Sequence, residues 1–425
     1  MELRKSYKMT ELGIIPTSWN LKKLDKLCVK LNVGFVGVCE PFYTVEGAGI
    51  LLIRTGNLQD DKFVFNDSKY VSEVFHLRNQ KSRVTSGDIL IARHGSSGSA
   101  VIVPENIKDA NTLNIVILRI DKSKIDNVFA AYCINSSFVR KQVLKSIAGS
   151  TQGVINTKEI AKLFLPLPSL GEQTFIANAL SDVDALINRL EKLIEKKRLI
   201  NLGAMQKLLA PKENWIQMNL GNCALLKARI GWQGLTTKEY KKSGEYYLIT
   251  GTEFRNGFID FDQCHFVDYS RYKQDLNIQV KKDDILITKD GTIGKVAFIK
   301  TLAKPATLNS GVFVIRPKNK AFDPLFMFYV FRSQVFTDFL AQLSAGSTIS
   351  HLYQKDFVHF EFKIPKTLNE QKQIAQSLMD IDESIQFLEQ KLYKFRQVKQ
   401  GMMQNLLTGK IRLVRPLKQR ILKYS

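Results

Sequence analysis

Two long segments of the chain carry apolar residues at alternating intervals of four and three positions, separated mainly by polar residues. The first series is Ile176, Leu180, Val183, Ile187, Leu190 and Ile194. The second series is Ile374, Leu378, Ile381, Ile385, Leu388, Leu392 and Phe395. Such a heptad pattern places an apolar stripe on an α-helix and favours its burial against another helix. An amphipathic helix lying on its own domain is the alternative, but two matched stripes favour an interface between the two helices or with a partner chain.

Both segments also carry the signals of helix ends. Pro168 and Pro365 precede them, and acidic residues lie early while Lys and Arg lie late, which complements the helix dipole. A single helix over residues 172–208 would be about 55 Å long, at ~1.5 Å per residue. That length corresponds to about 16 base pairs of duplex DNA.

Short runs rich in β-branched and aromatic residues occupy much of the remaining chain. Examples are "GILLIRTGNL" (49–58), "KFVFND" (62–67), "GDILIAR" (87–93) and "NIVILRI" (114–120). These runs predict strands joined by turns. Helical spacing predicts one helix near 127–145 and another near 323–342. The apolar run "PLFMFYVF" (324–331) is too short to cross a bilayer and is predicted to be the buried face of a helix.

The whole pattern occurs twice, at an offset that drifts only from 195 to 198 residues. Matching blocks are "IPTSW" (15–19) with "PKENW" (211–215), "GDILIARHGSSG" (87–98) with "DDILITKDGTIG" (283–294), "NTLNIVILRI" (111–120) with "ATLNSGVFVIRP" (306–317), and "GEQTFIANAL" (171–180) with "NEQKQIAQSL" (369–378). This period is far too long for a solenoid. Two copies of one module indicate an internal pseudo-twofold axis, the covalent analogue of a symmetric dimer.

The predicted fold class is α+β, with two similar globular domains separated by two long antiparallel helices that form a coiled coil. The predicted boundaries are 1–165 for the first globular domain with its entry segment, 166–210 for the central helix, 211–362 for the second globular domain, and 363–425 for the C-terminal helix with a basic tail.

The charge balance is more informative than the overall composition. Of 425 residues, 44% are hydrophobic and 24% are charged, as in an ordinary globular protein. Sixty-two Lys and Arg against 40 Asp and Glu give a net charge of +22, which points first to a polyanionic partner such as nucleic acid. A generally basic protein without such a partner is the alternative. The five cysteines form no CxxC pair, and the start of the chain has no apolar signal segment, so a cytoplasmic protein is expected, with no membrane partner.

Residues with the spacing of an active site are absent from the sequence. "GSSG" (95–98) does not match the dinucleotide-binding glycine fingerprint, and there is no phosphate loop and no Pro-Pro dipeptide of the methyltransferase type. "EFK" (361–363) resembles half of a nuclease metal site, but its counterpart "LFL" (163–165) does not, so a structural strand is predicted there. Gly, Thr, Ser and Asn recur in the loops, which suits binding better than catalysis.

Several motifs together carry a family resemblance over the whole chain. The segments "ELGIIPTSW" (11–19), "LPSLGEQTFIANAL" (167–180) and "KQGMMQNLLTGKIRLV" (399–414) are similar to specificity subunits of type I restriction-modification systems. The Glu-Gln-x-x-Ile-Ala motif follows Pro365 in the second copy, and in the first copy the interval after Pro168 is one residue shorter.

The resemblance implies a non-catalytic subunit with two DNA target-recognition domains, each reading one half of a bipartite site. It also implies that the two helical regions form a coiled coil and dock two modification (methyltransferase) subunits, and that restriction (motor-nuclease) subunits complete the complex. S-adenosylmethionine and ATP with Mg would then belong to the partners, and this chain would hold no cofactor and no metal.

The two copies differ most at loop tips, which suggests two different half-sites and an asymmetric target. The residue types that suit base edges are Arg54, Asn57, Arg93, His94 and Gln152 in the first copy, and Arg255, Lys289, Asp290 and His351 in the second. Residues suited to phosphate or backbone contacts are Ser96, Ser97, Ser150, Thr151, Thr250, Thr292, Ser347 and Thr348. Each of these residues has the alternative role of satisfying the backbone of its own turn.

Two other functions stay open at this point. One is a pseudo-symmetric coiled-coil scaffold without sequence-specific DNA recognition, and the other is a methyltransferase fused to its recognition domain. The last 16 residues, 410–425, carry six Lys or Arg and no acidic residue, and they fit a DNA or partner contact as well as a solvated tail.

Overall fold

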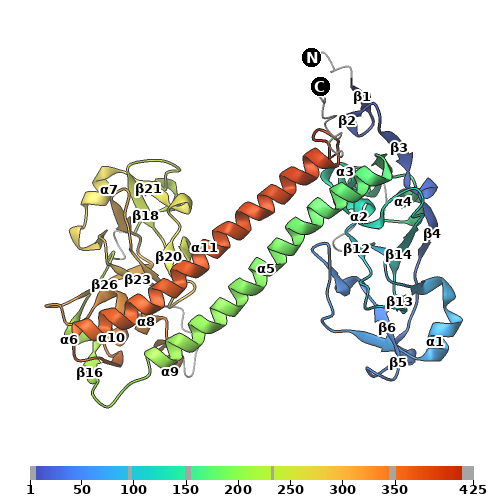
Figure 1. Ribbon diagram of the computed structural model, residues 1–425. Helices are drawn as coiled ribbons and strands as arrows, with labels where there is room; N and C mark the ends of the chain where they lie inside the picture. The colour runs from blue at the N-terminus through green and yellow to red at the C-terminus, as the bar shows by residue number, and fades with distance from the viewer. Residues whose placement is uncertain (1–5, 94–97, 149–154, 231–233, 344–350, 414–425) are drawn as a thin grey trace, which may run out of the picture. The chain divides into compact units, whose positions relative to one another are not determined.

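The computed structural model describes residues 6–93, 98–148, 155–230, 234–343 and 351–413 (Figure 1). The chain forms two compact units. Unit 1 comprises residues 1–191 and 391–425, and unit 2 comprises residues 192–390. Each unit combines one globular part with a section of both long helices, whereas the boundaries predicted from the sequence keep each helix whole and stay a prediction.

Two sheets form the globular part of unit 1. The first is antiparallel, in the order β12-β11-β14-β4. The second is mixed, in the order β10-β13-β6-β9-β5, because β6 and β13 are parallel. The strands of these sheets are β4 (Cys28–Val33), β5 (Tyr43–Thr44), β6 (Ile50–Ile53), β9 (Lys69–Val71), β10 (Arg83–Val84), β11 (Ile89–Ala92), β12 (Ala100–Ile102), β13 (Ala110–Thr112) and β14 (Ile115–Ile120). Shorter pairs are β1 (Tyr7–Thr10) with β2 (Gly13–Pro16), β3 (Asn20–Lys23) with β15 (Phe164–Leu167), and β7 (Leu58–Gln59) with β8 (Lys62–Phe63).

The helices of unit 1 are α1 (Glu73–Arg78), α2 (Asn127–Asn135), α3 (Ser137–Ala148), α4 (Thr157–Ala161) and the first part of α5 (Leu170–Leu208). Its largest core joins the first sheet to α2 and the start of α5, with Leu118, Phe129 and Leu180 fully buried in one cluster. A second core lies between the two sheets, where Ile53, Leu90 and others pack. Burial of this apolar surface is the main driving force for the fold of the unit.

Unit 2 has the same plan. Its first sheet runs β17-β26-β23-β24 and its second runs β21-β18-β25-β22. The strands are β16 (Ile216–Asn219), β17 (Ala224–Ala228), β18 (Tyr246–Ile249), β19 (Phe254–Arg255), β20 (Phe258–Ile259), β21 (His265–Val267), β22 (Gln279–Val280), β23 (Ile285–Thr288), β24 (Val296–Phe298), β25 (Ala306–Leu308), β26 (Val312–Pro317) and β27 (Glu361–Ile364). The helices are α6 (Leu220–Cys223), α7 (Tyr269–Lys273), α8 (Pro324–Phe331), α9 (Gln334–Leu343), α10 (Gln354–Phe357) and α11 (Leu368–Leu406). The predicted α+β class is confirmed, and "EFK" lies on strand β27, which pairs with β16.

The single helix expected in each globular part is in fact two. In unit 1, α2 ends before Ser136, whose backbone is extended at φ −69° and ψ 153°. The Ser136 hydroxyl donates to the Cys133 carbonyl (2.5 Å) and accepts from the Val139 amide (3.4 Å), so it caps the next helix. In unit 2 the Ser333 hydroxyl donates to the Val330 carbonyl at the same break (2.7 Å). Apolar spacing runs through both breaks, which is why it predicted one helix.

The Glu-Gln motif attaches each long helix to its globular part. The buried Gln173 side chain accepts the Asp126 amide (2.8 Å) and donates to the Pro168 carbonyl (3.0 Å). Gln371 repeats the first bond with the amide of Asp323 (2.8 Å). Because Asp126 and Asp323 cap α2 and α8, the glutamine fixes the start of one helix against the start of another.

The two long helices are antiparallel within unit 1, because residue numbers rise along α5 while those of their contact partners on α11 fall. Asp184 of α5 pairs with Lys399 of α11 (2.6 Å), and Glu191 pairs with Arg396 (2.8 Å). Figure 1 draws α5 in green and α11 in orange to red.

In unit 2 the same helices pair again, with equivalent residues exchanged. Glu389 accepts from Arg198 (2.5 Å), and Asp382 accepts from Asn201 (2.7 Å). These glutamate and aspartate positions lie 198 residues after Glu191 and Asp184, which is the offset of the sequence repeat. The antiparallel arrangement predicted from the heptads is therefore present within each unit.

Most residues of the predicted stripes are buried. Those that are buried are Ile176, Leu180, Ile187, Leu190, Ile194, Ile374, Leu378 and Ile385. Those that are partly buried are Val183, Ile381, Leu388, Leu392 and Phe395. The residues nearest each helix start, such as Ile176 and Ile374, belong to the core of a globular part. The start of each stripe therefore packs against the domain, and the later part packs in the helix pair.

Candidate nucleic-acid interface

The variable loops of unit 2 converge where three strands begin or end. Lys289 follows β23, and its amide donates to the carbonyl of Gly311, just before β26 (2.8 Å). The carbonyl of Lys289 accepts the amide of Leu352 (2.8 Å). Thr250 follows β18, and its carbonyl oxygen would lie 3.9 Å from a Cβ placed on Gly311. Segments up to about a hundred residues apart in the sequence thus form one cluster.

Polar side chains of this cluster contact one another. The imidazole Nδ1 of His351 is hydrogen-bonded to the carboxylate of Asp290. The His351 ring lies 4.4 Å from the exposed ring of Tyr353. The Lys289 ammonium lies 5.4 Å from the centre of the Phe313 ring. An acceptor, a ring donor and a cation thus lie together at a surface, which suits recognition of base edges and phosphates.

The corresponding cluster of unit 1 is held by Arg93, which follows β11. Its Nε donates to the Ile155 carbonyl (3.1 Å), and one of its terminal nitrogens donates to the amide oxygen of Asn114 (2.6 Å). Arg93 therefore joins the loop after β11 to the chain entering α4, as His351 and Asp290 do in unit 2. Eight predicted contacts lie outside the described residues: His94, Ser96, Ser97, Ser150, Thr151, Gln152, Ser347 and Thr348.

Asn57 is placed differently from the prediction. Its side chain is only 2% exposed. Its amide oxygen accepts the Arg54 amide (2.9 Å), and its amide nitrogen donates to the Val64 carbonyl (2.9 Å). The buried carboxylate of Glu253 accepts the Thr250 amide at the equivalent turn of unit 2 (3.1 Å). The structure therefore gives Asn57 the turn-forming role that was its alternative.

Two further predicted residues are engaged in local contacts, and a third is exposed. The Arg54 guanidinium donates to the exposed Asp67 carboxylate (2.7 Å), which holds the pKa of Asp67 below its usual range. The Thr250 hydroxyl donates to Glu253 (2.8 Å), while Thr292 is exposed next to Lys289 and Asp290. Thr250 and Thr292 lie beside the cluster of unit 2.

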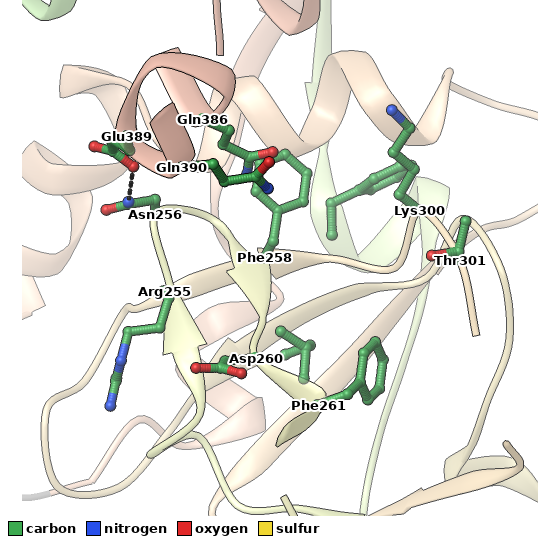
Figure 2. Close-up of a pocket in the computed structure, with 12 residues that line it drawn as sticks. Arg255, Asn256, Phe258, Asp260, Phe261, Lys300, Thr301, Gln386, Glu389 and Gln390 are labelled. Carbon is green, nitrogen blue, oxygen red and sulfur yellow. Dashed lines mark hydrogen bonds between the residues drawn. The ribbon is translucent and has the colours of Figure 1, made fainter. Parts of the chain in front are cut away.

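Arg255 lies elsewhere. It is exposed on the β19–β20 hairpin, where its guanidinium donates to the carbonyls of Thr252 (2.8 Å) and Phe254 (3.0 Å). Figure 2 shows it on the wall of an open pocket beside α11, together with Asn256, Phe258 and Glu389.

Sequence reasoning missed Asn114 and Tyr353. Asn114 has φ +56°, accepts from Arg93, and lies in the repeated block 111–120, so its place in a repeat was a usable signal. Tyr353 lies two residues after His351, but a single exposed tyrosine forms no sequence pattern that would predict a role. In the part of the chain that the structure describes, no three His, Cys, Asp or Glu side chains come together as metal ligands. No helix among the described ranges is long and apolar enough to cross a membrane.

Comparisons with known proteins agree with this arrangement. The family model "Type I restriction modification DNA specificity domain" matches twice, over residues 24–199 and 230–395. A Methanocaldococcus jannaschii protein assigned as the MjaX specificity subunit of a type I restriction enzyme is 27% identical, over 96% of this chain and 97% of its own. The type I restriction enzyme MjaVIII specificity subunit of the same organism is 26% identical, over 80% and 83%.

Solved structures share the fold. The S subunit of a type I restriction-modification system from M. genitalium has a TM-score of 0.62 at 16% identity, covering 96% of this chain and 98% of that one. A chain from a structure that addresses complex assembly and conformational transition of the type I system has a TM-score of 0.51 at 14% identity, covering 93% and 99%. The chain thus carries two copies of the matched domain, and it belongs to the type I restriction-modification DNA specificity family.

Proposed function

We propose that this chain is the DNA specificity subunit of a type I restriction-modification complex, and that each unit reads one half of a two-part DNA site. One observation carries the proposal: the two units repeat their framework contacts but differ where the loops converge. The framework pair Arg119–Asp88 (2.7 Å) recurs as Arg316–Asp284 (2.6 Å). The described loop contacts differ, because Arg93 is bonded to Asn114 in unit 1, whereas Asp290 is bonded to His351 in unit 2.

The differing loop pairs favour different half-sites. Unit 1 presents an arginine bonded to an asparagine, and unit 2 presents a carboxylate bonded to a histidine. Arginine suits the acceptor edge of guanine, asparagine suits adenine, and a carboxylate accepts from the amino group of cytosine. The target would then be asymmetric. The net charge of +22 supplies the attraction to phosphates that any such complex needs.

The long helices are the proposed docking site for two modification subunits. Large apolar side chains on them remain exposed, and on α5 Leu186, Leu193 and Ile200 recur every seven residues. This regular exposed stripe is what a partner helix would cover. S-adenosylmethionine, ATP and Mg would be bound by the modification and restriction subunits in the cytoplasm. This chain would supply sequence recognition and no catalytic group.

The test is a base-resolution methylome of the host with and without this gene. The expected result is the loss of one gapped, two-part motif with unequal halves in the deletion strain. An unchanged methylome in a strain that demonstrably expresses the gene would contradict the proposal. Two identical halves would retain the specificity role and remove the asymmetry.

A further inference from the structure

A β-hairpin of unit 1 reaches from the loop that contains Arg54 to the long helix α5. Hairpin β7–β8 begins four residues after Arg54 and turns through Asp60 and Asp61, both at positive φ. Immediately after the turn, the Lys62 ammonium pairs with the carboxylate of Glu191 (2.9 Å). The hairpin therefore connects the strands that carry the loops directly to the helix.

The equivalent hairpin of unit 2 makes the equivalent contact with α11. Hairpin β19–β20 turns through Asn256 (φ +52°) and Gly257 (φ +88°), the pair favoured by a tight hairpin turn of this hand. The Asn256 side-chain amide donates to Glu389 (3.1 Å), as Figure 2 shows. Phe258 of the same hairpin lines the pocket with Gln386 of α11.

The two glutamates occupy the same position of the repeat, 198 residues apart. Each also accepts from an arginine of the other long helix, Arg396 for Glu191 (2.8 Å) and Arg198 for Glu389 (2.5 Å). Burial alone would raise the pKa of the Glu191 carboxyl, but the hydrogen bonds from Lys62 and Arg396 lower it below the ordinary value. Each glutamate thus joins a hairpin and both helices in one polar contact.

This contact lies far from the point where each globular part is attached to its helix. Glu191 is 18 residues beyond Gln173, and Glu389 is 18 residues beyond Gln371. Eighteen residues of helix span about 27 Å, at ~1.5 Å per residue. The attachments nearer the start come from α2 and α8, through Tyr132 on Asp184 (2.7 Å) and its equivalent in unit 2. The hairpins contact the helices from the strand side of each domain, and in unit 2 Lys300, which follows β24, adds an exposed pair with Glu383 of α11 on that side.

We propose that these two hairpin contacts, Lys62 on Glu191 and Asn256 on Glu389, fix the tilt of each recognition domain on the long helices and thereby restrict the length of the DNA spacer between the half-sites. This inference rests on the proposed function. Lys62, Asn256 and the two glutamates are positioning residues, because they hold the loops at one angle and need not touch DNA. Without the contacts, each domain would sample a wider range of tilts about its attachment at the start of the long helix.

The substitutions that test this leave the fold in place. Lys62 and Glu191 side chains are 46% and 30% exposed, so Lys62→Ala removes a surface contact. Asn256→Asp keeps a residue that tolerates positive φ, but it sets a carboxylate against Glu389. Lys62→Arg preserves the ion pair and is the rescue variant. Lys162→Ala removes the surface pair with Glu159 in the same unit and is the matched control.

The experiment is a methylome of the host carrying K62A together with N256D in the full-length gene. The expected motif keeps both half-site sequences, but sites with one base pair more or less in the spacer become methylated. Discrimination against them should fall about three- to fivefold for each of the two substitutions, the size of one good surface interaction. K62R and K162A should keep a single spacer length.

Three other outcomes are distinguishable. A single spacer length in the double variant overturns the inference and leaves the proposed function intact. Loss of all methylation, with circular dichroism still that of the folded protein, also overturns it, because the hairpins would then serve recognition itself. A wild-type strain in which no gapped motif depends on the gene would mean that the proposed function has failed.

Discussion

At the scale of single residues, equivalent positions of the repeat carry unequal contacts. Glu172 is only 4% exposed. It accepts from the indole N–H of Trp19 (3.1 Å) and from Nε and one terminal nitrogen of Arg412 (2.5 and 2.8 Å). Its counterpart Glu370 has one partly exposed partner, Lys212 (3.3 Å). Within the basic C-terminal segment, Arg412 therefore binds the buried Glu172 at the start of α5 and is not a freely solvated charge.

Glu172→Ala should therefore destabilise unit 1 by about 2–4 kcal/mol, because Arg412 and Trp19 lose a buried acceptor. Glu370→Ala is the matched control and should cost below about 1 kcal/mol, as expected of an exposed pair. Urea unfolding followed by tryptophan fluorescence measures both. Equal shifts in the two variants would show that the burial of Glu172 has no energetic effect.

Asp290→Ala should change the methylated motif at one position of one half-site only. Loss of an acceptor that suits cytosine would relax discrimination there by about 1–3 kcal/mol, and His351 would lose its partner. The methylome of the variant strain measures this. Asp262→Ala, which alters an exposed carboxylate of the same unit outside the loop cluster, should leave the motif unchanged. A change in both half-sites would refute the assignment of one unit to each half.

At the scale of elements, the sequence predicted what depends on periodic spacing. The two heptad series lie within α5 and α11, the helix predicted over 172–208 nearly matches α5, and the repeat offset indicated two copies of one plan. Spacing could not reveal that Ser136 interrupts a helix, because its effect comes from a side-chain hydrogen bond. Spacing also could not show that Asn57 is buried, because a turn that contains Asn has the same sequence pattern whether it faces solvent or the core. Contacts between residues about two hundred positions apart, such as Arg198 with Glu389, need the fold itself.

Asp382 offers a test of the polar contacts that set the register of the helix pair. Its carboxylate is nearly buried and accepts from Tyr329 (3.0 Å), Arg332 (2.6 Å) and Asn201 (2.7 Å). Asp382→Ala should cost about 3–5 kcal/mol, because it leaves a desolvated guanidinium without a carboxylate. Asp184→Ala, at the more exposed equivalent position, should cost less. Thermal unfolding compares the two, and a larger effect for Asp184 would contradict this ranking.

At the scale of the whole molecule, both ends of the chain belong to unit 1. The Tyr7 hydroxyl donates to the Gly409 carbonyl (3.2 Å), and a Cβ on Gly409 would lie 2.5 Å from Pro16. The segment that leads from α5 into unit 2 is exposed at Ala210 and Pro211. That exposed segment is therefore a suitable place at which to open the chain.

A circular permutant that begins at Pro211, with the native ends joined, should fold and give the native methylation motif. Its new ends lie at exposed residues, and the first and last described segments are in contact at Tyr7 and Gly409. Opening the chain between Leu286 and Ile287, which are fully buried in β23, should abolish folding and serves as the control. Loss of methylation in the Pro211 permutant, despite a folded chain, would show that the segment at 210–211 has a role of its own.

The exchange of partners between the two copies has a consequence for inheritance. Glu191 is held by Arg396 of the second copy, and Glu389 is held by Arg198 of the first. A substitution at one of these positions would remove a contact made by the other copy, so the sequences of the two helical segments are expected to co-vary. The described loop pairs Arg93–Asn114 and Asp290–His351 each stay within one copy. Recombination between genes that cross over inside the helical segments would exchange a whole recognition domain and create a new target in one event, while the shared helices stay compatible.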